Sequence, residues 1–389
     1  MTKVLFIVDG YPNNKQSNNI FVKNQVDALR KRGTEAGIMV IDIRSIRRIR
    51  RFGIYFSLLD GVPVWFISFP WGAFFEKTGQ KLYNILGKIL FKHITKVFFP
   101  DIIHAHFGGS GITGSLIKTK YNIPLVITEH SSLMLPRNRN EIQKQAFVDA
   151  YRNSDKVIAV SSVLAGEITK RGIKNVSIIP NIIPRYYFDF PGQIITSKRK
   201  RFISVGNLTS NKRFDLLISA FSRLCKLHET AELVIAGNGP LYKTLLKDVR
   251  TLNLEKRIHL IGYVSNSELP QLYRESICFV LPSEYETFGV VYAEAMASGI
   301  PVIATECGGP EEIVNSNNGL LIKRNNEEDL FNALCFMYHN HMNYNAIKIA
   351  EECYIRYSEE TVTDQILNIY HGLHADLHGN SDNKLKSGY

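Results

Sequence analysis

Short apolar runs alternate with longer segments of helical period, and this alternation occurs twice along the chain. In the first half a helix is predicted over Phe21–Lys31, and in the second over Asp215–Lys226. Each apolar run is bounded by glycine, proline, aspartate or asparagine, as expected for strands that crossover helices bury on both faces. We therefore predict a parallel sheet with covering helices in each half. The predicted strands are Val4–Val8, Ala36–Ile41, Ile102–His106, Leu125–Thr128, Val157–Val160, Phe202–Val205, Glu232–Ala236, Ile258–Ile261, Ile277–Leu281, Val302–Ala304 and Gly319–Ile322.

The 389 residues suffice for two domains. A linker is predicted between Asn181 and Arg201, because this stretch follows Pro180 and combines two further prolines with the run Ser197-Lys198-Arg199-Lys200-Arg201. We place an N-terminal domain at 1–184 and a C-terminal domain at 185–360. Residues 361–375 are predicted to form a C-terminal helix that could cross back to the first domain. Residues 376–389 are predicted to be a disordered tail.

Charge and cysteine content narrow the class of protein. Residues 1–190 carry 27 Lys+Arg and 13 Asp+Glu, a net +14, whereas residues 191–389 carry 20 and 23, a net −3. One basic half indicates a face that meets something anionic. The five widely spaced cysteines argue against a disulfide framework or a zinc cluster. We find no secretory leader and no apolar stretch of the ~20 residues that a membrane-spanning helix needs.

The segment from Ser283 to Gly299 carries the most chemical information. A short helix is predicted to begin near Gly289, which leaves the backbone N–H groups of Phe288, Gly289 and Val290 free to bind an anion. A diphosphate could dock there while carboxylates on either side, Glu286 and Glu294, accept hydrogen bonds from hydroxyl groups. Because those carboxylates repel a diphosphate, a cation is needed nearby. Lys212 is the first candidate and Arg213 the second.

This segment resembles the E-x7-E motif of retaining glycosyltransferases, and the chain as a whole resembles glycosyltransferase family 4 (glycosyl transferases group 1) with a GT-B fold. Each match is weak alone, but together they follow the family order over most of the chain. The matching segments are Asp101–His106, Val126–His130, Val160-Ser161, Ile179–Asn181, Ser204–Leu208 with Lys212, Val234–Leu241, Leu260–Val264 and Ala304–Ile313.

The resemblance implies an α/β protein of two doubly wound Rossmann-like domains that face each other across a deep cleft. The N-terminal domain, 1–184, would bind the acceptor, and the C-terminal domain, 185–360, would bind the nucleotide sugar. It also implies that Glu286 holds hydroxyls of the donor sugar, that Glu294 binds the ribose diol and that Lys212 neutralises the diphosphate. His130 would lie beside the anomeric carbon and the acceptor hydroxyl. We assign the catalytic role to Glu286, His130 and Lys212. The other implied donor-binding residues are Glu294, Phe288, Gly289, Val290, Asn207, Arg213, Gly237, Tyr263 and Val264.

The chain departs from the family pattern at two informative positions. Asn207 stands where the family usually has an arginine, so Arg213 or another basic residue would have to supply the second phosphate cation. Asn19 stands where the family has a glycine, and the turn can survive because asparagine tolerates left-handed backbone. We place Asn19 on the acceptor side, together with His106, Arg47 and Arg48.

Several features have a simpler alternative explanation. His104 and His106 share one face of a strand and could bind a metal with His130, but no carboxylate or cysteine has matching spacing, so a structural or acceptor-contacting role is preferred. For Lys81–Phe99 we prefer a helix that covers the sheet, and the alternative is a helix that lies on an anionic membrane. Arg44–Phe56 is a basic run followed by aromatic residues. It could bind lipid headgroups or a lipid-diphosphate acceptor, or it could be a plain solvated loop.

We therefore predict a retaining glycosyltransferase of the hexosyltransferase type, which moves a sugar from a UDP- or GDP-sugar to a glycan or lipid-linked acceptor. The resemblance implies bacterial surface polysaccharide or glycolipid biosynthesis. No metal or other cofactor and no nucleic-acid partner is expected. The predicted location is cytoplasmic, with the inner face of the cell membrane as a further option for the basic half. The alternatives are a nucleotide-sugar epimerase on the same scaffold and a non-catalytic sugar- or lipid-binding protein.

Overall fold

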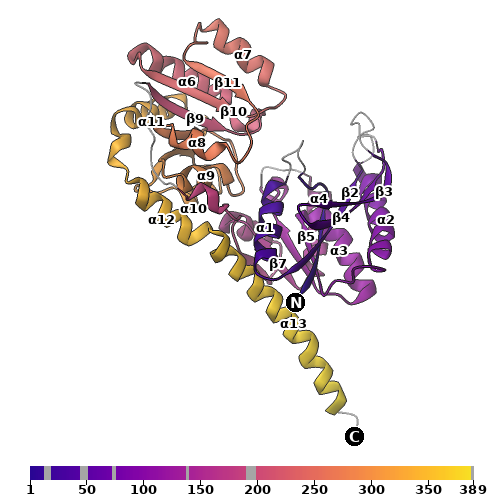
Figure 1. The fold of residues 1–389 in the computed structure, drawn as a ribbon. Coiled ribbons are helices and arrows are strands. Elements are labelled where there is room, and N and C mark those ends of the chain that lie inside the picture. The colour runs from indigo at the N-terminus through magenta and orange to yellow at the C-terminus, as the bar shows by residue number, and fades with distance from the viewer. Residues whose placement is uncertain (13–18, 44–50, 72–75, 137–139, 190–198, 387–389) are drawn as a thin grey trace. The chain divides into compact units, whose positions relative to one another are not determined.

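The computed structural model describes residues 1–12, 19–43, 51–71, 76–136, 140–189 and 199–386 (Figure 1). The chain divides into two compact units. Unit 1 comprises Met1–Ile182 and Val362–Tyr389, and unit 2 comprises Ile183–Thr361. Within the described residues, both units are built around mainly parallel sheets with helices packed against them, so the α/β fold class predicted from the sequence is confirmed.

Unit 1 contains an eight-stranded sheet in the order β3-β4-β2-β1-β5-β6-β7-β8. All pairs are parallel except β3 with β4, which form an antiparallel hairpin at one edge. The sequence did not predict this hairpin, since part of β3 was assigned to a basic surface run. The strands are β1 (Lys3–Val8), β2 (Glu35–Asp42), β3 (Gly53–Leu59), β4 (Val62–Ser68), β5 (Ile102–His106), β6 (Leu125–Glu129), β7 (Lys156–Ala159) and β8 (Val176–Ile178).

The helices of unit 1 pack against this sheet, and α3 (Phe107–Tyr121) lies especially close to it. A Cβ atom added to Gly111 would lie 2.8 Å from Ile127, and one added to Gly114 would lie 2.7 Å from Leu125. The small residues of α3 thus allow its backbone to approach β6 closely. The other helices are α1 (Ile20–Lys31), α2 (Glu76–Ile94), α4 (Glu141–Arg152) and α5 (Ser162–Thr169).

Unit 2 contains a parallel six-stranded sheet in the order β11-β10-β9-β12-β13-β14. Its strands are β9 (Lys200–Val205), β10 (Ala231–Ala236), β11 (Ile258–Gly262), β12 (Cys278–Leu281), β13 (Val302–Thr305) and β14 (Gly319–Ile322). Its helices are α6 (Phe214–Leu227), α7 (Tyr242–Thr251), α8 (Leu269–Arg274), α9 (Val290–Ala297), α10 (Pro310–Ile313), α11 (Glu327–Asn340) and α12 (Ala346–Tyr357).

The last helix, α13 (Glu359–Lys386), returns to unit 1. Val362, Ile366 and Tyr370 recur at intervals of four residues and are buried in the core of that unit. The helix continues to Lys386, whereas the sequence predicts a disordered tail from residue 376. Extending a formed helix adds one hydrogen bond per residue without a new nucleation step, which is the physical reason that a polar tail can remain helical.

Candidate functional site

The site in unit 2 lies where the strand order of its sheet reverses. The chain runs outward from β9 through β10 to β11 and then returns to form β12 on the other side of β9. Loops that follow the two neighbouring strands meet at such a point, where α/β sheets bind their ligands. Here Lys212 follows β9 and Glu286 follows β12, and the Lys212 Nζ atom lies 2.5 Å from Oε1 of Glu286.

Glu286 is held in place from several directions. The hydroxyl of Ser283 donates to its Oε1 atom at 2.8 Å. Its backbone N–H donates to the carbonyl of Cys307 at 3.2 Å, and its own carbonyl accepts from the N–H of Gly309 at 2.9 Å. The loops after β12 and β13 therefore fix the carboxylate beside Lys212. The structure brings together two residues of the predicted donor site that are 74 positions apart in the sequence.

The helix α9 begins at Val290, directly after this loop. Gly289 precedes it with φ = +90°, a left-handed conformation that glycine adopts without strain, and no side chain caps the helix. Because the first N–H groups of a helix lack partners within the helix, this end can receive an anion. Phe288 is buried, and its ring packs edge-on against Tyr357, so its side chain anchors the loop.

Glu294 lies on α9 and is buried, with 5% of its surface exposed. The Tyr273 hydroxyl donates to its Oε2 atom at 3.3 Å, and Tyr187 lies near enough to the carboxyl group to favour its ionised form. Burial raises the pKa of Glu294 to about 7, against the lowering effect of the two tyrosines. No described contact joins Glu294 to Lys212 directly, so this carboxyl group occupies a separate environment from Glu286.

The remaining predicted donor residues lie around the same edge of the sheet. Asn207 is exposed after β9, and Tyr263 (57% exposed) and Val264 follow β11. Gly237 follows β10 and packs so closely on the neighbouring loop that a Cβ atom would lie 1.9 Å from the Gly206 carbonyl oxygen. Arg213 is paired with Asp215 at 3.0 Å and lies 3.7 Å from Glu284, and the Asp215 hydrogen bond raises the pKa of its guanidinium. Arg213, the candidate for the second phosphate cation, therefore already has carboxylates beside it.

Three histidine rings stack on one another in unit 1, two of them on β5 and one directly after β6. His104 and His106 point from the same face of β5, and the ring of His106 stacks on that of His130, which follows β6. His106 Nδ1 and His130 Nε2 share a hydrogen bond of 2.9 Å, and Asn181 lies near the His130 ring. Burial lowers the pKa of all three, to about 3 for His106, so the rings are neutral near pH 7.

The first histidine of this stack is also tied to the C-terminal helix. The Tyr370 hydroxyl on α13 lies 2.5 Å from Nδ1 of His104, and the Thr128 hydroxyl lies 2.6 Å from Nε2. These contacts use the nitrogens of His104 within the fold. The described residues contain no group of three or more His, Cys, Asp or Glu side chains placed to hold a metal ion.

Glu129 holds in place the backbone that follows β5 and the backbone that follows β6, next to His130. The sequence analysis assigned it no role. Its carboxylate accepts hydrogen bonds from the N–H groups of Gly108, His130 and Ser131 at 2.8, 2.9 and 2.6 Å. The Tyr151 hydroxyl donates a fourth at 2.5 Å. Burial raises the pKa of Glu129, an effect that these four donors oppose. An acid at the end of a buried strand, directly before the motif histidine, was the sequence signal that could have identified it.

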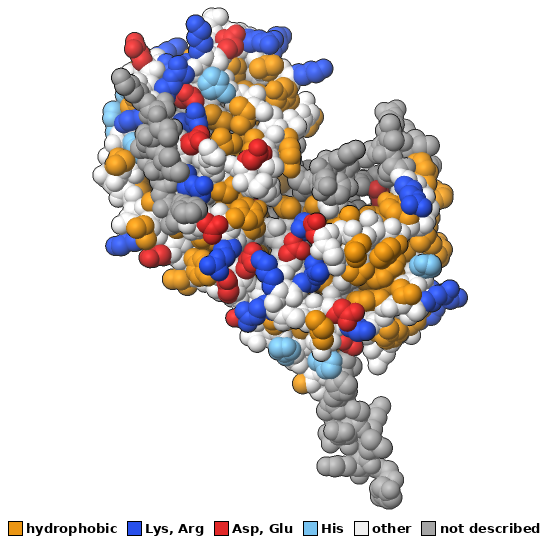
Figure 2. Space-filling model, viewed as in Figure 1, with side chains coloured by type: hydrophobic (Ala, Val, Ile, Leu, Met, Phe, Trp, Pro, Cys, Tyr) orange, Lys and Arg blue, Asp and Glu red, His pale blue; other side chains and the backbone are white. Residues whose placement is uncertain are grey.

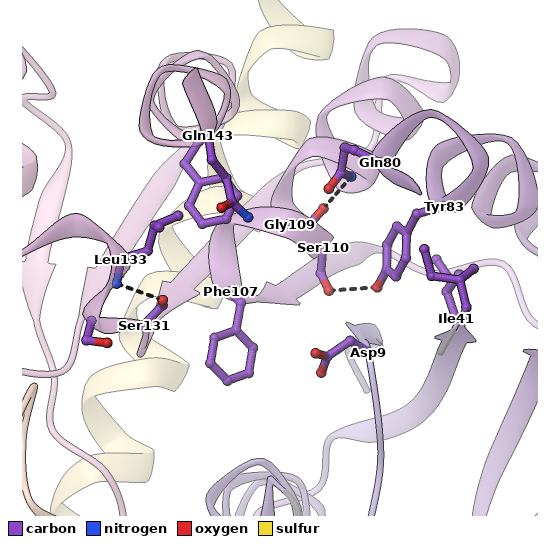
Figure 3. A pocket seen from close by; sticks show the side chains of 13 residues that line it. Asp9, Ile41, Gln80, Tyr83, Phe107, Gly109, Ser110, Ser131, Leu133 and Gln143 are labelled. Carbon is purple, nitrogen blue, oxygen red and sulfur yellow. Dashed lines mark hydrogen bonds between the residues drawn. The ribbon is translucent and has the colours of Figure 1, made fainter. Parts of the chain in front are cut away.

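A cavity of about 430 Å³ opens in unit 1 beside the histidine stack (Figure 3). It lies where the sheet order of this unit reverses, because β1 and β5 are neighbours although β2, β3 and β4 separate them in the chain. Asp9 follows β1, and Phe107 follows β5. The lining residues are Asp9, Ile41, Ile43, Gln80, Tyr83, Phe107, Gly109, Ser110, Ser131, Ser132, Leu133, Gln143 and Phe147.

Of the four residues predicted for the acceptor side, the structure describes Asn19 and His106. Asn19 adopts the left-handed conformation, with φ = +61°, and its side-chain amide donates to Asp9 and to the Gly10 carbonyl, both at 3.0 Å. His106 is buried within the histidine stack. Arg47 and Arg48 lie outside the described residues. No helix in the described part of the chain combines the length and apolar character needed to cross a membrane.

Two family models match adjoining parts of this chain. Residues 19–185 match Glycosyltransferase Family 4, and residues 188–352 match Glycosyl transferases group 1. The chain is 33% identical over 232 residues to an uncharacterized glycosyltransferase of Methanocaldococcus jannaschii, in an alignment that covers 59% of this chain and 63% of the relative. The chain therefore spans less than two thirds of that relative's length. It is 26% identical to the putative teichuronic acid biosynthesis glycosyltransferase TuaC of Bacillus subtilis, over 85% of this chain and 88% of the relative.

Solved structures share the fold at low sequence identity. Sucrose-phosphate synthase from Thermosynechococcus elongatus superimposes with a TM-score of 0.80 at 19% identity, covering 97% of this chain and all of that one. HepE of Anabaena in complex with UDP-glucose gives a TM-score of 0.73 at 19% identity, with coverage of 96% and 100%. These likenesses establish the fold.

Proposed function

Since this chain belongs to glycosyltransferase family 4, we propose that it transfers a sugar from a nucleotide-diphosphate donor, bound in unit 2, to an acceptor bound in unit 1. The observation that carries the proposal is the contact between Lys212 and Glu286 beside the start of α9. A lysine ammonium has three N–H donors, of which Glu286 takes one. The others can bind phosphate oxygens while the uncapped end of α9 supplies backbone N–H groups.

In the proposed reaction the bond between the anomeric carbon and the diphosphate oxygen breaks, and a bond from an acceptor hydroxyl oxygen to that carbon forms. The proton of the hydroxyl leaves with the departing diphosphate. Lys212 and the start of α9 stabilise the charge that develops on the leaving group. Glu286 orients the donor sugar through its hydroxyls, and we expect the linkage to keep its anomeric configuration. The protein cations serve the diphosphate, so we expect no requirement for a metal.

The donor part of the proposal is tested by thermal shift of the full chain with nucleoside diphosphates and their sugars. A bound ligand raises the unfolding temperature by mass action. UDP is the first probe, because HepE of similar fold was solved with UDP-glucose. Losing a charge-assisted hydrogen bond costs about 1.5–3 kcal/mol, so Lys212→Met should weaken UDP binding about 10- to 100-fold. Lys226→Met, at an exposed position on α6, is the matched control.

Two outcomes would reject this reading. If no nucleoside diphosphate stabilises the protein, unit 2 is not a donor site. If UDP stabilises the wild type and Lys212→Met equally, the diphosphate does not bind beside Glu286. Incubating the protein with donor alone also separates the enzyme classes, because an epimerase converts the nucleotide sugar without an acceptor. NMR of a transfer product would show whether the anomeric configuration is retained.

We also propose that unit 1 docks on an anionic membrane through β3, β4 and α2. Between residues 43 and 99 the sequence has ten Lys or Arg and only two acids, Asp60 and Glu76. Figure 2 shows hydrophobic side chains gathered over the part of unit 1 where Figure 1 labels these elements. Phe56 on β3 is 55% exposed, and its ring contacts Trp65, which in turn contacts Phe98 after α2.

The exposed face of α2 continues this surface with both apolar and basic side chains. Ile85 and Ile89 are 55% and 49% exposed, and Lys88, Lys92 and Lys96 are exposed around them. Apolar groups surrounded by lysines fit the interface of an anionic bilayer. A location on the inner face of the membrane also agrees with polysaccharide or glycolipid synthesis, which we propose as the pathway because the relative TuaC is described as a teichuronic acid biosynthesis enzyme.

Co-sedimentation with phosphatidylcholine vesicles, with and without 30% phosphatidylglycerol (about one lipid in three, enough to give a negative surface potential), tests the docking. We expect binding only to the anionic vesicles, weakened by salt and by the double charge reversal Lys92→Glu/Lys96→Glu. The control reverses two exposed lysines of α7 in unit 2, Lys243→Glu/Lys247→Glu. Equal binding to both kinds of vesicle, or equal losses in the two variants, would contradict the proposed face.

A further inference from the structure

Arg213 directly follows the proposed phosphate lysine, and its guanidinium contacts three segments of unit 2. Its Nε and Nη2 atoms donate to the Asp215 carboxylate at 3.1 and 3.0 Å, in the two-pronged geometry that arginine forms with a carboxylate. Its Nη1 atom donates to the side-chain oxygen of Asn325 and lies 3.7 Å from Glu284. These partners belong to the first turn of α6, the loop after β14 and the loop after β12. Arg213 therefore ties the turn that carries Lys212 to two neighbouring loops.

The other side of this turn is fastened to the loop that carries Glu286. The backbone N–H of Glu284 donates to the Asn211 carbonyl at 2.8 Å, and the Asn211 side-chain amide donates to the Tyr285 carbonyl at 3.1 Å. Lysine carries its charge on a flexible four-carbon stem, so the position of its ammonium depends on where the turn holds its Cα atom. Contacts on both sides of Lys212 therefore keep its ammonium 2.5 Å from Glu286.

The backbone at Arg213 is strained. It has φ = +51° and ψ = +40°, a left-handed conformation that residues other than glycine and asparagine rarely adopt. Such a conformation persists only where the surrounding structure holds it, and it is found most often at functional sites. The contacts of the guanidinium supply that support here. The side chain and the backbone of Arg213 thus act together on the shape of the turn.

The same contacts make the guanidinium a poor ligand for phosphate. Asp215 and Glu284 place two carboxylates beside one positive charge. A diphosphate that approached Arg213 would be repelled by them, or would have to displace Asp215 from its two-pronged pair. Lys212 differs, because its ammonium has three N–H donors and gives one of them to Glu286. The two neighbouring cations therefore suit different roles.

We infer that Arg213 is a positioning residue of the donor site, which holds Lys212 against Glu286 and does not itself contact the diphosphate. The inference rests on the proposed binding of a nucleotide-diphosphate donor in unit 2 and specifies how one residue of that site acts. On this account Arg213 does not replace the arginine that the family usually has at the position of Asn207. Loss of the Arg213 contacts weakens donor binding only through Lys212.

A double-mutant cycle, measured by isothermal titration calorimetry of the full chain with UDP, tests the inference. Arg213→Gly removes the contacts and suits the left-handed backbone, so the fold is kept. Alone it should weaken UDP binding about tenfold, because a small displacement of a binding group can cost this much. Added to Lys212→Met it should weaken binding by less than about twofold more, since the lysine to be positioned is already absent.

Two results of this cycle would overturn the inference. If the losses of Arg213→Gly and Lys212→Met multiply in the double variant, Arg213 contacts the diphosphate independently. If Arg213→Gly binds UDP as the wild type does, the contacts of Arg213 do not position Lys212.

Two further variants separate positioning from charge. Arg213→Lys keeps the positive charge but lacks the planar fork that reaches several partners, so its UDP affinity should stay well below that of the wild type. Asn325 is also left-handed, with φ = +55°, so Asn325→Gly keeps the loop conformation and removes one partner of Arg213. It should weaken UDP binding several-fold, whereas an arginine that binds phosphate would bind it at least as well once released. Wild-type affinity in either variant contradicts the positioning role.

Arg223→Met is the matched control. Arg223 also lies on α6 and pairs with Glu328 at 2.7 Å, so its removal breaks an ion pair of the same kind away from Lys212. UDP affinity should be unchanged, and a loss as large as that of Arg213→Gly would show that general destabilisation of unit 2 explains both. If UDP fails to bind the wild type, the proposed donor site itself is rejected, whereas the other contrary results reject the role of Arg213 alone.

Discussion

The buried carboxyl group of Glu294 yields the sharpest test of the proposal that unit 2 binds a nucleotide. Burial raises its pKa to about 7, so near pH 7 about half of the molecules hold the proton. Ribose hydroxyls that donate to the carboxylate favour its ionised form. If only the ionised form binds UDP, the apparent affinity follows the ionised fraction, which rises from about 0.1 at pH 6 to about 0.9 at pH 8. We therefore expect an affinity gain of about tenfold over this interval.

Isothermal titration calorimetry with UDP from pH 6 to pH 8 measures this gain. Titrations in buffers of different ionisation enthalpy at pH 7 should also show release of about half a proton per UDP bound. Glu294→Gln preserves the shape of the side chain and removes its titration. UDP itself titrates near pH 6, so the prediction concerns the difference between the two proteins. Identical pH profiles and proton release for wild type and Glu294→Gln would refute the role of Glu294 at the ribose.

The same pKa shift predicts how stability depends on pH. Between the ordinary value of 4.5 and about 7, the native state holds a proton that the unfolded chain has released, so raising the pH favours unfolding. The difference between these two pKa values corresponds to about 3 kcal/mol in the free energy of unfolding. The stability of the wild type relative to Glu294→Gln should fall by about this amount between pH 4.5 and pH 8. Urea denaturation checks this, and a difference that grows with pH would have the wrong sign.

Three substitutions test the packing around the two sites. Gly237→Ala places a methyl group 1.9 Å from a backbone oxygen, so urea titration should show unit 2 destabilised by more than about 2 kcal/mol, whereas Gly166→Ala, with open space around it, should not destabilise the protein. Glu129→Gln turns an acceptor of four hydrogen bonds into a group that also donates, which should cost about 1–3 kcal/mol by urea unfolding and leave UDP binding in unit 2 unchanged. Tyr370→Phe removes the hydroxyl beside His104 and should cost about 1 kcal/mol, and no loss would show that apolar packing alone secures α13.

The secondary structure of the parallel sheets was largely visible in the sequence. The predicted strand Ile102–His106 coincides with β5, and the predicted helix Phe21–Lys31 differs from α1 by one residue at its start. These elements are set by local patterns of apolar residues and by turn residues at their ends. The antiparallel strand β3 was missed, because its exposed aromatic residues suggested a surface segment and its partner β4 lies across a tight turn.

The sequence by itself determined which residues could form a donor site. The order of motifs identified Lys212, Glu286 and the glycine that starts α9, because each has a local conformational or chemical signature. Tertiary structure decided the rest, since the reversal of strand order brings Lys212 to Glu286 in unit 2 and Asp9 near Phe107 in unit 1. It also joins His104 to Tyr370 across 266 positions and buries Glu294 deeply enough to raise its pKa. Contacts and desolvation of this kind depend on how distant segments pack, and local sequence patterns do not encode them.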